Sequence, residues 1–215
     1  ETLHKPVMAI IGGSKISTKI ELLLTLIKKV DFLVIGGAMA NTFLLEKGYK
    51  VGGSLVEKEK IHIAKEIIKK AEKENCIIIL PSDVIIAKNL EDTDDINNVS
   101  IDNINETSSI FDIGDKTIEK ITNSLATCKT LFWNGPLGVY EKKPFDNSTN
   151  VIGRTAAILT KSNLLTSVVG GGDTVAALNN AELSGGFSYV SIAGGALMEW
   201  LEGKSLPGLV FLENS

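Results

Sequence analysis

Five apolar runs along the chain each end in a glycine-rich turn, and this pattern constrains the fold more than any other feature. The first run, Val7-Met-Ala-Ile-Ile11, is apolar at every position and stops at Gly12-Gly13. A strand that is apolar on both faces is typical of a parallel sheet covered by helices on both sides. The other four runs stop at residues 36–37, 134–135, 170–172 and 194–195.

Helical patterns fill the intervals between these strands. Residues 16–29 place apolar side chains on one helical face, and residues 57–73 do the same with lysine and glutamate on the outer face. Further helices are expected at 38–46, 116–126, 146–159 and from Asp173, and after Gly195. The alternation predicts an α/β fold, a Rossmann-like open, mainly parallel sheet with helices on both faces in three αβα layers. No repeat or linker interrupts it, so we expect one domain over residues 1–215.

The stretch from Asp83 to Ile113 departs from this rhythm. Short strand-like runs at 84–87, 99–101 and 110–111 surround an acidic, asparagine-rich segment at 89–98. We interpret the stretch as a small antiparallel excursion from the main sheet, with residues 89–98 as a turn or mobile loop.

The composition limits the kinds of molecule that the chain is expected to bind. The net charge of -4 argues against nucleic acid and against a membrane surface, since both attract basic proteins. Arg154 is the one arginine in the sequence. A site for a small substrate that carries a carboxylate and a phosphate normally uses several guanidinium groups, so we do not expect one here.

The glycine turns indicate what the chain does bind. Ligands of open α/β sheets lie beyond the carboxyl ends of the strands, and glycine there lets backbone N–H groups approach an anion, with phosphate the first candidate.

Two familiar phosphate motifs fit poorly. Gly203-Lys204-Ser205 has Met198 where a Walker loop needs its earlier glycine, and residues 170–174 continue into Val175 where a dinucleotide fingerprint has glycine. A nicotinamide-dependent enzyme stays open as an alternative.

Six strings resemble, in order and spacing, the C-terminal domain of phosphoglycerate kinase. They are GGSKISTK (12–19), VIGGAMANTFL (34–44), LPSD (80–83), WNGPLGVYE (133–141), VVGGGDT (168–174) and LEGKSLPG (201–208). The family transfers a phosphoryl group between 1,3-bisphosphoglycerate and ADP with Mg²⁺ in glycolysis. The resemblance therefore implies a cytoplasmic, monomeric kinase half that binds ADP or ATP. The 3-phosphoglycerate site is expected on an N-terminal half outside these residues, without which the chain is expected to be inactive.

The resemblance also implies roles for individual residues. Lys19 corresponds to the lysine that follows the transferred phosphoryl group, Lys15 to the one near the α-phosphate, and Glu141 to the carboxylate that binds the ribose hydroxyls. Asp173 corresponds to the Mg²⁺ ligand, although it could equally cap a helix. Catalytic roles fall on Lys19, Gly170, Gly194 and Gly195, and further nucleotide contacts on Gly37, Ala38, Ile110, Asn134, Gly135, Pro136, Gly170, Gly171, Gly172, Asp173 and Thr174.

Several positions depart from the family pattern. Thr18 stands where the family has aspartate, and Ile110 stands where a glycine is expected against the purine. Ile192-Ala193 and Leu197 add apolar bulk where the family has threonine, glycine and serine. These departures leave a second hypothesis open, a divergent ADP- or ATP-binding module without catalysis.

Overall fold

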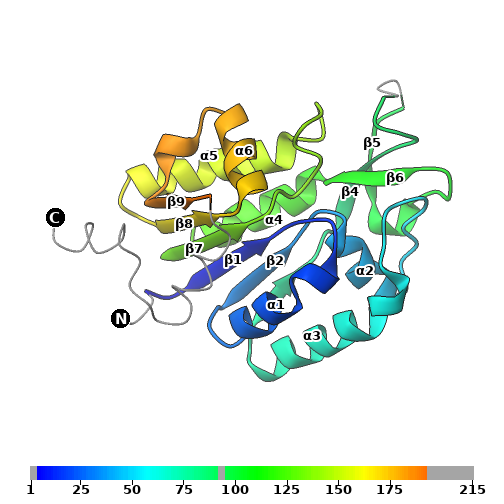
Figure 1. Cartoon of the computed structure of the whole chain (residues 1–215), viewed down its shortest axis with the longest axis horizontal. Helices are drawn as coiled ribbons and strands as arrows, with labels where there is room; N and C mark the ends of the chain where they lie inside the picture. Colours follow the sequence, from blue (N-terminus) through cyan, green and yellow to red (C-terminus); the bar gives the residue numbers. More distant parts are fainter. Residues whose placement is uncertain (1–3, 92–94, 193–215) are drawn as a thin grey trace.

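The computed structural model describes residues 4–91 and 95–192. Its main sheet has six parallel strands in the order β3-β2-β1-β7-β8-β9 (Figure 1). The predicted parallel sheet is therefore confirmed. The strands are β1 (Val7–Ile11), β2 (Phe32–Ile35), β3 (Ile77–Ile79), β7 (Thr130–Asn134), β8 (Thr166–Gly170) and β9 (Tyr189–Ser191).

Strand β1 lies at the centre of the sheet and is buried along its whole length. Alternate side chains of a strand point to opposite faces, and β1 supplies two separate cores accordingly. Val7, Ala9 and Ile11 belong to one apolar cluster, whereas Met8 and Ile10 belong to the other. Both faces need apolar residues, which is why the run has no polar position.

Helices cover both faces, as the sequence predicts. The helices α1 (Ile20–Leu26), α2 (Met39–Glu46) and α3 (Ile61–Lys73) pack in the first cluster. The helices α4 (Asp115–Leu125), α5 (Asn147–Lys161) and α6 (Gly172–Asn180) pack in the second. Figure 1 shows the two groups on opposite sides of the sheet. None of the helices within residues 4–91 and 95–192 is long and apolar enough to cross a membrane.

Two helices, α1 and α3, begin later than the sequence predicts. Residues 16–18 form a 3₁₀ turn before α1, and residues 58–60 form another before α3. The physical reason at the first site is a competing interaction, because the N–H and hydroxyl of Ser17 both donate to Glu57. Lys19 consequently lies in the irregular joint between the 3₁₀ turn and α1.

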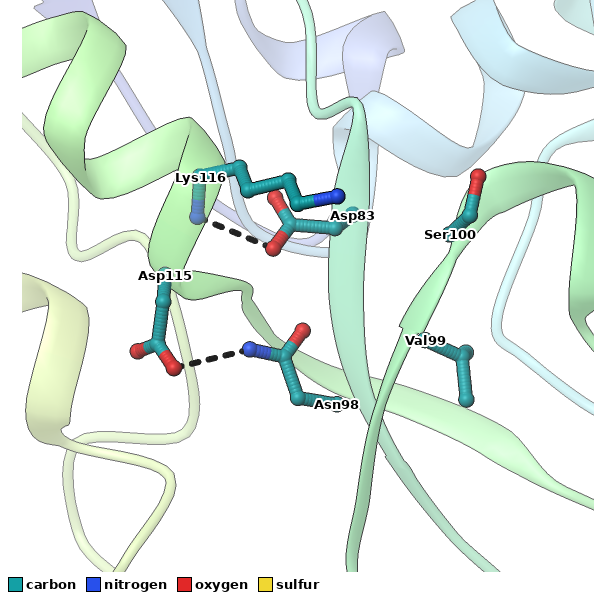
Figure 2. A pocket seen from close by; sticks show the side chains of 6 residues that line it. All are labelled: Asp83, Asn98, Val99, Ser100, Asp115 and Lys116. Atoms are coloured by element: carbon teal, nitrogen blue, oxygen red, sulfur yellow. Dashed lines mark hydrogen bonds between the residues drawn. The ribbon is translucent and has the colours of Figure 1, made fainter.

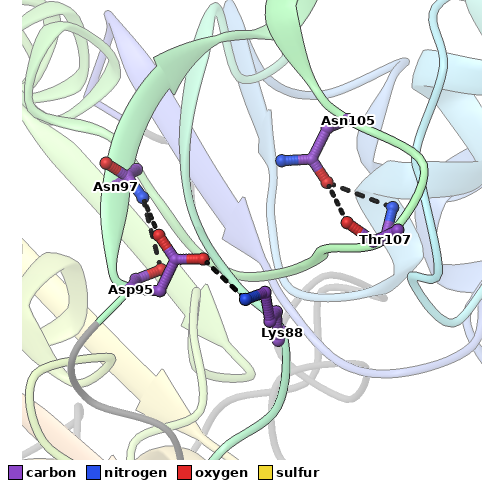
Figure 3. Close-up of polar contacts among 5 residues, drawn as sticks. All are labelled: Lys88, Asp95, Asn97, Asn105 and Thr107. Atoms are coloured by element: carbon purple, nitrogen blue, oxygen red, sulfur yellow. Dashed lines mark hydrogen bonds and ion pairs between the residues drawn. The ribbon is translucent and has the colours of Figure 1, made fainter.

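The excursion is confirmed as an antiparallel three-stranded sheet, β5-β4-β6. Its strands are β4 (Asp83–Ala87), β5 (Asn97–Ser100) and β6 (Ser109–Ile113), and it has its own small apolar cluster. The loop prediction for 89–98 is wrong at its end, since Asn97 and Asn98 pair with β4. Local polar contacts hold these connections, including Lys88 to Asp95 at 3.6 Å and Asn97 to Asp95 at 3.0 Å (Figure 3).

Candidate functional site

Four of the predicted glycine turns, those at 12–13, 36–37, 134–135 and 170–172, meet at one edge of the main sheet. Gly12 follows β1 and donates its N–H to the carbonyl of Asn134 at the end of β7 (2.9 Å). Gly36 follows β2 and donates to the carbonyl of Ile11 (3.0 Å). The chain turns away in opposite directions on either side of the β1–β7 pair, so this edge is the switch point at which open α/β sheets bind ligands.

The close packing of these turns explains two of the glycines. A Cβ on Gly12 would lie 1.9 Å from the carbonyl oxygen of Pro136. Gly37 has a φ of +66°, and its Cβ would lie 2.6 Å from the carbonyl oxygen of Gly13. The edge is therefore built of backbone against backbone, and side chains reach it only from a few positions.

Lys19 is one of those positions. Its ammonium group donates a hydrogen bond to the side-chain oxygen of Asn134, and the amide of Asn134 donates to the carbonyl of Gly170 at 3.0 Å. The two bonds connect the start of α1 with the ends of β7 and β8. Burial lowers the pKa of Lys19, and the charge of Asp173 acts in the opposite direction. A partly desolvated ammonium beside a neutral amide is well suited to receive an anion.

The first turn of α6 adds Thr174 and Asp173. The hydroxyl of Thr174 donates to the carbonyl of Gly170 (2.9 Å) and accepts from the N–H of Gly135 (2.6 Å), which locks α6 onto the turn after β7. Asp173 is exposed and does not cap the helix, because the cap position is Gly171. Its carboxylate is therefore available to a ligand.

Asp173 and Glu141 also approach the same tyrosine. Burial raises the pKa of Tyr140, and the charges of Glu141 and Asp173 raise it further. Asp173 thus lies within electrostatic range of both Lys19 and Tyr140, and Glu141 within range of the same tyrosine.

Glu57 is a site residue that sequence reasoning missed. Its carboxylate accepts from the N–H of Ser17 (3.1 Å) and from the hydroxyl of Ser17 (2.6 Å), and so holds the segment that carries Lys15 and Lys19. Burial favours a higher pKa for Glu57, but the hydrogen bonds from Ser17 and Ile16 and the charge of Lys15 outweigh it and lower the pKa. Lys15 itself is exposed. Glu57 appears in the sequence only as the first residue of a charged helix face.

The structure gives less direct support for the expected purine pocket. Gly37 donates its N–H to the carbonyl of Leu137 (2.9 Å), which connects the turn after β2 to the loop after β7. Ile110 lies in β6, donates its N–H to Ser54 (2.8 Å) and packs in the apolar cluster of the small sheet. Its predicted contact with a purine stays a prediction. Gly194 and Gly195, with Ala193 and Leu197, lie outside the described residues.

A separate pocket of about 260 Å³ lies at the start of α4 (Figure 2). The carboxylate of Asp83 accepts from the N–H groups of Lys116 (3.0 Å) and Thr117 (2.8 Å), and Asn98 donates to Asp115 (2.9 Å). These acidic groups serve the first turn of the helix. Among residues 4–91 and 95–192, no three histidine, cysteine, aspartate or glutamate side chains gather as a metal cluster.

The comparison with known proteins decides the family. The sequence profile of phosphoglycerate kinase matches residues 1–204. The chain belongs to the phosphoglycerate kinase family. A phosphoglycerate kinase of Chelativorans sp. is 52% identical over 97% of this chain, and one of Novosphingobium aromaticivorans is 50% identical over 98%. The match covers 52% and 53% of those proteins, so the chain spans about half their length.

Solved structures of phosphoglycerate kinases agree with the fold. That of Coxiella burnetii superposes with a TM-score of 0.88 at 43% identity and covers 99% of this chain and 54% of the other. That of Pyrococcus horikoshii superposes with a TM-score of 0.75 at 24% identity, which is a likeness of fold alone. Membership of a kinase family argues against the nicotinamide-dependent alternative.

Proposed function

We propose that this chain is the C-terminal, nucleotide-binding half of a phosphoglycerate kinase. The complete enzyme would transfer a phosphoryl group between 1,3-bisphosphoglycerate and ADP in glycolysis. The contact between Lys19 and Asn134 at the glycine edge carries the proposal, because it holds a cation over the backbone turns that are suited to receive phosphates. Phosphoryl transfer depends mainly on positioning and on neutralising charge, and both tasks suit this arrangement.

Each group at the edge has a task in this scheme. Lys19 would neutralise charge on the transferred phosphoryl group, and exposed Lys15 would meet the α-phosphate. Asn134, with the N–H groups of residues 170–172 and the turn of Gly135 and Pro136, would contact the phosphates. Glu141 would hold the ribose, and Gly37, Ala38 and Ile110 would line the purine pocket. The N–H groups of Gly194 and Gly195 would face the moving phosphoryl group.

Asp173 would hold Mg²⁺. Magnesium in nucleotide sites is usually bound by one or two carboxylates, with the remaining ligands supplied by water and substrate phosphates. An exposed aspartate next to Lys19, at the first turn of a helix beside the phosphate edge, fits that donor set. The metal would neutralise phosphate charge, while Asp173 keeps it beside the edge.

The acid substrate would bind outside this chain. Arg154, the one arginine of the sequence, is exposed in the middle of α5 and belongs to no part of the glycine edge. The relatives are about twice as long, which leaves room for a second half with the 3-phosphoglycerate site. We expect a cytoplasmic monomer that is inactive in phosphoryl transfer without that half.

A calorimetric titration with Mg-ADP tests nucleotide binding. The parent chain is expected to bind, and Lys19→Ala is expected to weaken binding about tenfold or more, because a hydrogen bond to a charged group is lost. Asp173→Asn should weaken Mg-ADP more than metal-free ADP. Lys129→Ala is the matched control, since Lys129 is exposed beside Pro6 at the opposite edge of the sheet. A folded parent that does not bind Mg-ADP would overturn the proposal.

A binding module without catalysis is the second candidate. Thr18 favours it, because its hydroxyl donates to the carbonyl of Lys15 (2.9 Å) where the family has a carboxylate. Assay of the complete gene product for ATP formation from 1,3-bisphosphoglycerate and ADP separates the two candidates. Nucleotide binding without turnover would favour the module, and turnover would exclude it.

A further inference from the structure

Asp112 is a buried carboxylate that the scheme above does not use. It lies in β6, is 1% exposed, and its Oδ2 accepts from the N–H of Ser148 at 3.0 Å. Its Oδ1 accepts from the hydroxyl of Ser148 and from the N–H of Ile113 (2.8 Å). Ser148 is fully buried in the first turn of α5, where a carboxylate also stabilises the helix. Asp112 therefore ties the small sheet to the start of α5.

The loop between β7 and α5 packs directly on this carboxylate. A Cβ on Gly138 would lie 2.3 Å from Oδ1 of Asp112 and 2.4 Å from the carbonyl oxygen of Phe145. The backbone of Gly138 therefore packs against the Asp112 carboxylate with no room for a side chain between them.

Neighbouring residues hold the same loop at both of its ends. Val139 donates its N–H to the carbonyl of Phe111 (2.9 Å), the residue before Asp112. The rings of Phe111 and Phe145 lie 5.1 Å apart. Leu137 donates its N–H to the hydroxyl of Thr149 (3.1 Å) in the first turn of α5. The segment from 140 to 144 lies between these two points, with one further contact from Lys142 to Glu91 (2.6 Å), and Glu141 is exposed near its start.

We infer that Asp112, together with Ser148, is a positioning residue that fixes the 137–145 loop so that Glu141 meets the ribose of the nucleotide. The inference rests on the proposed function, since it deepens the role of the same site. The phosphate end of the site is held by other contacts, those of Lys19 and Asn134.

The role of Asp112 as a hydrogen-bond acceptor requires its ionised form. Burial raises its pKa to about 7, hydrogen bonds from Ser148 and Ile113 oppose the rise, and the charge of Asp146 adds to it. The ionised carboxylate accepts all three hydrogen bonds. An asparagine in its place would turn an N–H donor towards Ser148 or Ile113, and one of these bonds would be lost.

The variant Asp112→Asn tests the inference, because it should weaken the binding of a ligand that has a ribose and not of one that lacks it. Calorimetry of the chain at pH 8 compares Mg-ADP with Mg-pyrophosphate, which lacks the ribose and the base. We expect the variant to bind Mg-ADP about tenfold more weakly, and Mg-pyrophosphate within about twofold of the parent. Asp146→Asn is the matched control, because this neighbouring aspartate bonds to Asn150 (2.9 Å) and should leave both affinities unchanged.

A double variant of Asp112 and Glu141 provides a second test. If Asp112 acts through Glu141, then Asp112→Asn should have little further effect on Mg-ADP binding in a Glu141→Gln background. Additive losses, or equal losses for Mg-ADP and Mg-pyrophosphate, would overturn the inference. If Asp112→Asn does not fold, Ser148→Ala must show the same loss confined to Mg-ADP, and its absence would overturn the inference too.

The parent chain separates this inference from the function on which it rests. A parent that does not bind Mg-ADP overturns the proposed function and the inference together. A parent that binds, with Asp112→Asn equal to it, overturns the inference alone.

Discussion

Lys19 illustrates how a single residue is prepared for its ligand. Its ammonium is half-buried and donates a hydrogen bond to Asn134, which is neutral. The positive charge is therefore not cancelled by an ion pair, and an incoming phosphate meets a cation that has already lost part of its water. Electrostatic attraction is stronger in such a setting than in bulk solvent.

Asp112 makes stability depend on pH in a direction opposite to that of a paired carboxylate. Its pKa is raised from 3.8 to about 7 in the folded chain. Between about pH 4 and pH 7 the folded state keeps a proton that the unfolded state has lost, so this group lowers stability as pH rises. Above about pH 7 Asp112 is ionised in both the folded and the unfolded chain, so its contribution to stability no longer changes with pH.

Denaturant unfolding at several pH values measures this effect. Asp112→Asn should flatten the decline between about pH 4 and pH 7, and Asp146→Asn should retain most of it, because burial is the largest cause of the raised pKa and the charge of Asp146 a smaller one. A parent whose stability rises steadily with pH over this range, unchanged in Asp112→Asn, would contradict the assignment.

Residues of the site were predictable to different degrees. The resemblance indicated Lys19, Asn134 and Asp173, and the structure brings them together. Glu57 and Asp112 were missed because their partners, Ser17 and Ser148, are 40 and 36 residues away along the chain. The available signal was weak in both cases. Asp112 was a lone carboxylate within an apolar strand run, and Glu57 was one of many charges on a helix.

At the scale of elements, the turn after β1 depends on glycine. Gly12→Ala would place a Cβ 1.9 Å from the carbonyl oxygen of Pro136, so the substitution requires a shift of the backbone at the sheet edge. We expect a loss of about 3 kcal/mol or more in the free energy of unfolding, at the upper end of overpacking effects. Thermal and denaturant unfolding measure it.

Gly185→Ala is the control for this substitution. Gly185 has no atom within 4 Å of an added Cβ, so the substitution should leave the free energy of unfolding within about 0.5 kcal/mol of the parent. Equal stability of the two variants would show that the turn after β1 can relax and that close packing does not require its glycine.

The strands were predictable because each is a short apolar run bounded by a turn, and both faces of the sheet require apolar side chains. The helix boundaries were not. The predicted helices included residues 16–18 and 58–60, but the backbone forms 3₁₀ turns at both places. At the first, Ser17 bonds to Glu57, a tertiary contact that local sequence does not reveal. Strand β5 was also hidden, since Asn97 and Asn98 join the sheet through backbone bonds to β4 despite their polar side chains.

The two cysteines can show whether the two faces of the main sheet unfold together. Cys76 packs in the apolar cluster on one face of the main sheet and Cys128 in the cluster on the other, and both are free thiols. Burial raises the pKa of each to about 11, so neither forms a reactive thiolate near neutral pH. We expect thiol reagents to label the folded chain slowly and both cysteines together at the denaturant midpoint.

Mass spectrometry of singly labelled chains measures this. Labelling of Cys76 well before Cys128 would mean that one layer opens without the other, and would contradict a single cooperative unit.

The strand order has a consequence for how the chain opens. Strands β1 to β3 come from one continuous stretch and β7 to β9 from another, and the pairing of β1 with β7 is the strand contact that joins them. A nucleotide held by Lys19 from the first stretch and by residues 170–174 from the second would bridge that seam. Its binding would slow amide hydrogen exchange on both sides, far beyond the residues it touches, because neither half could then separate without releasing it.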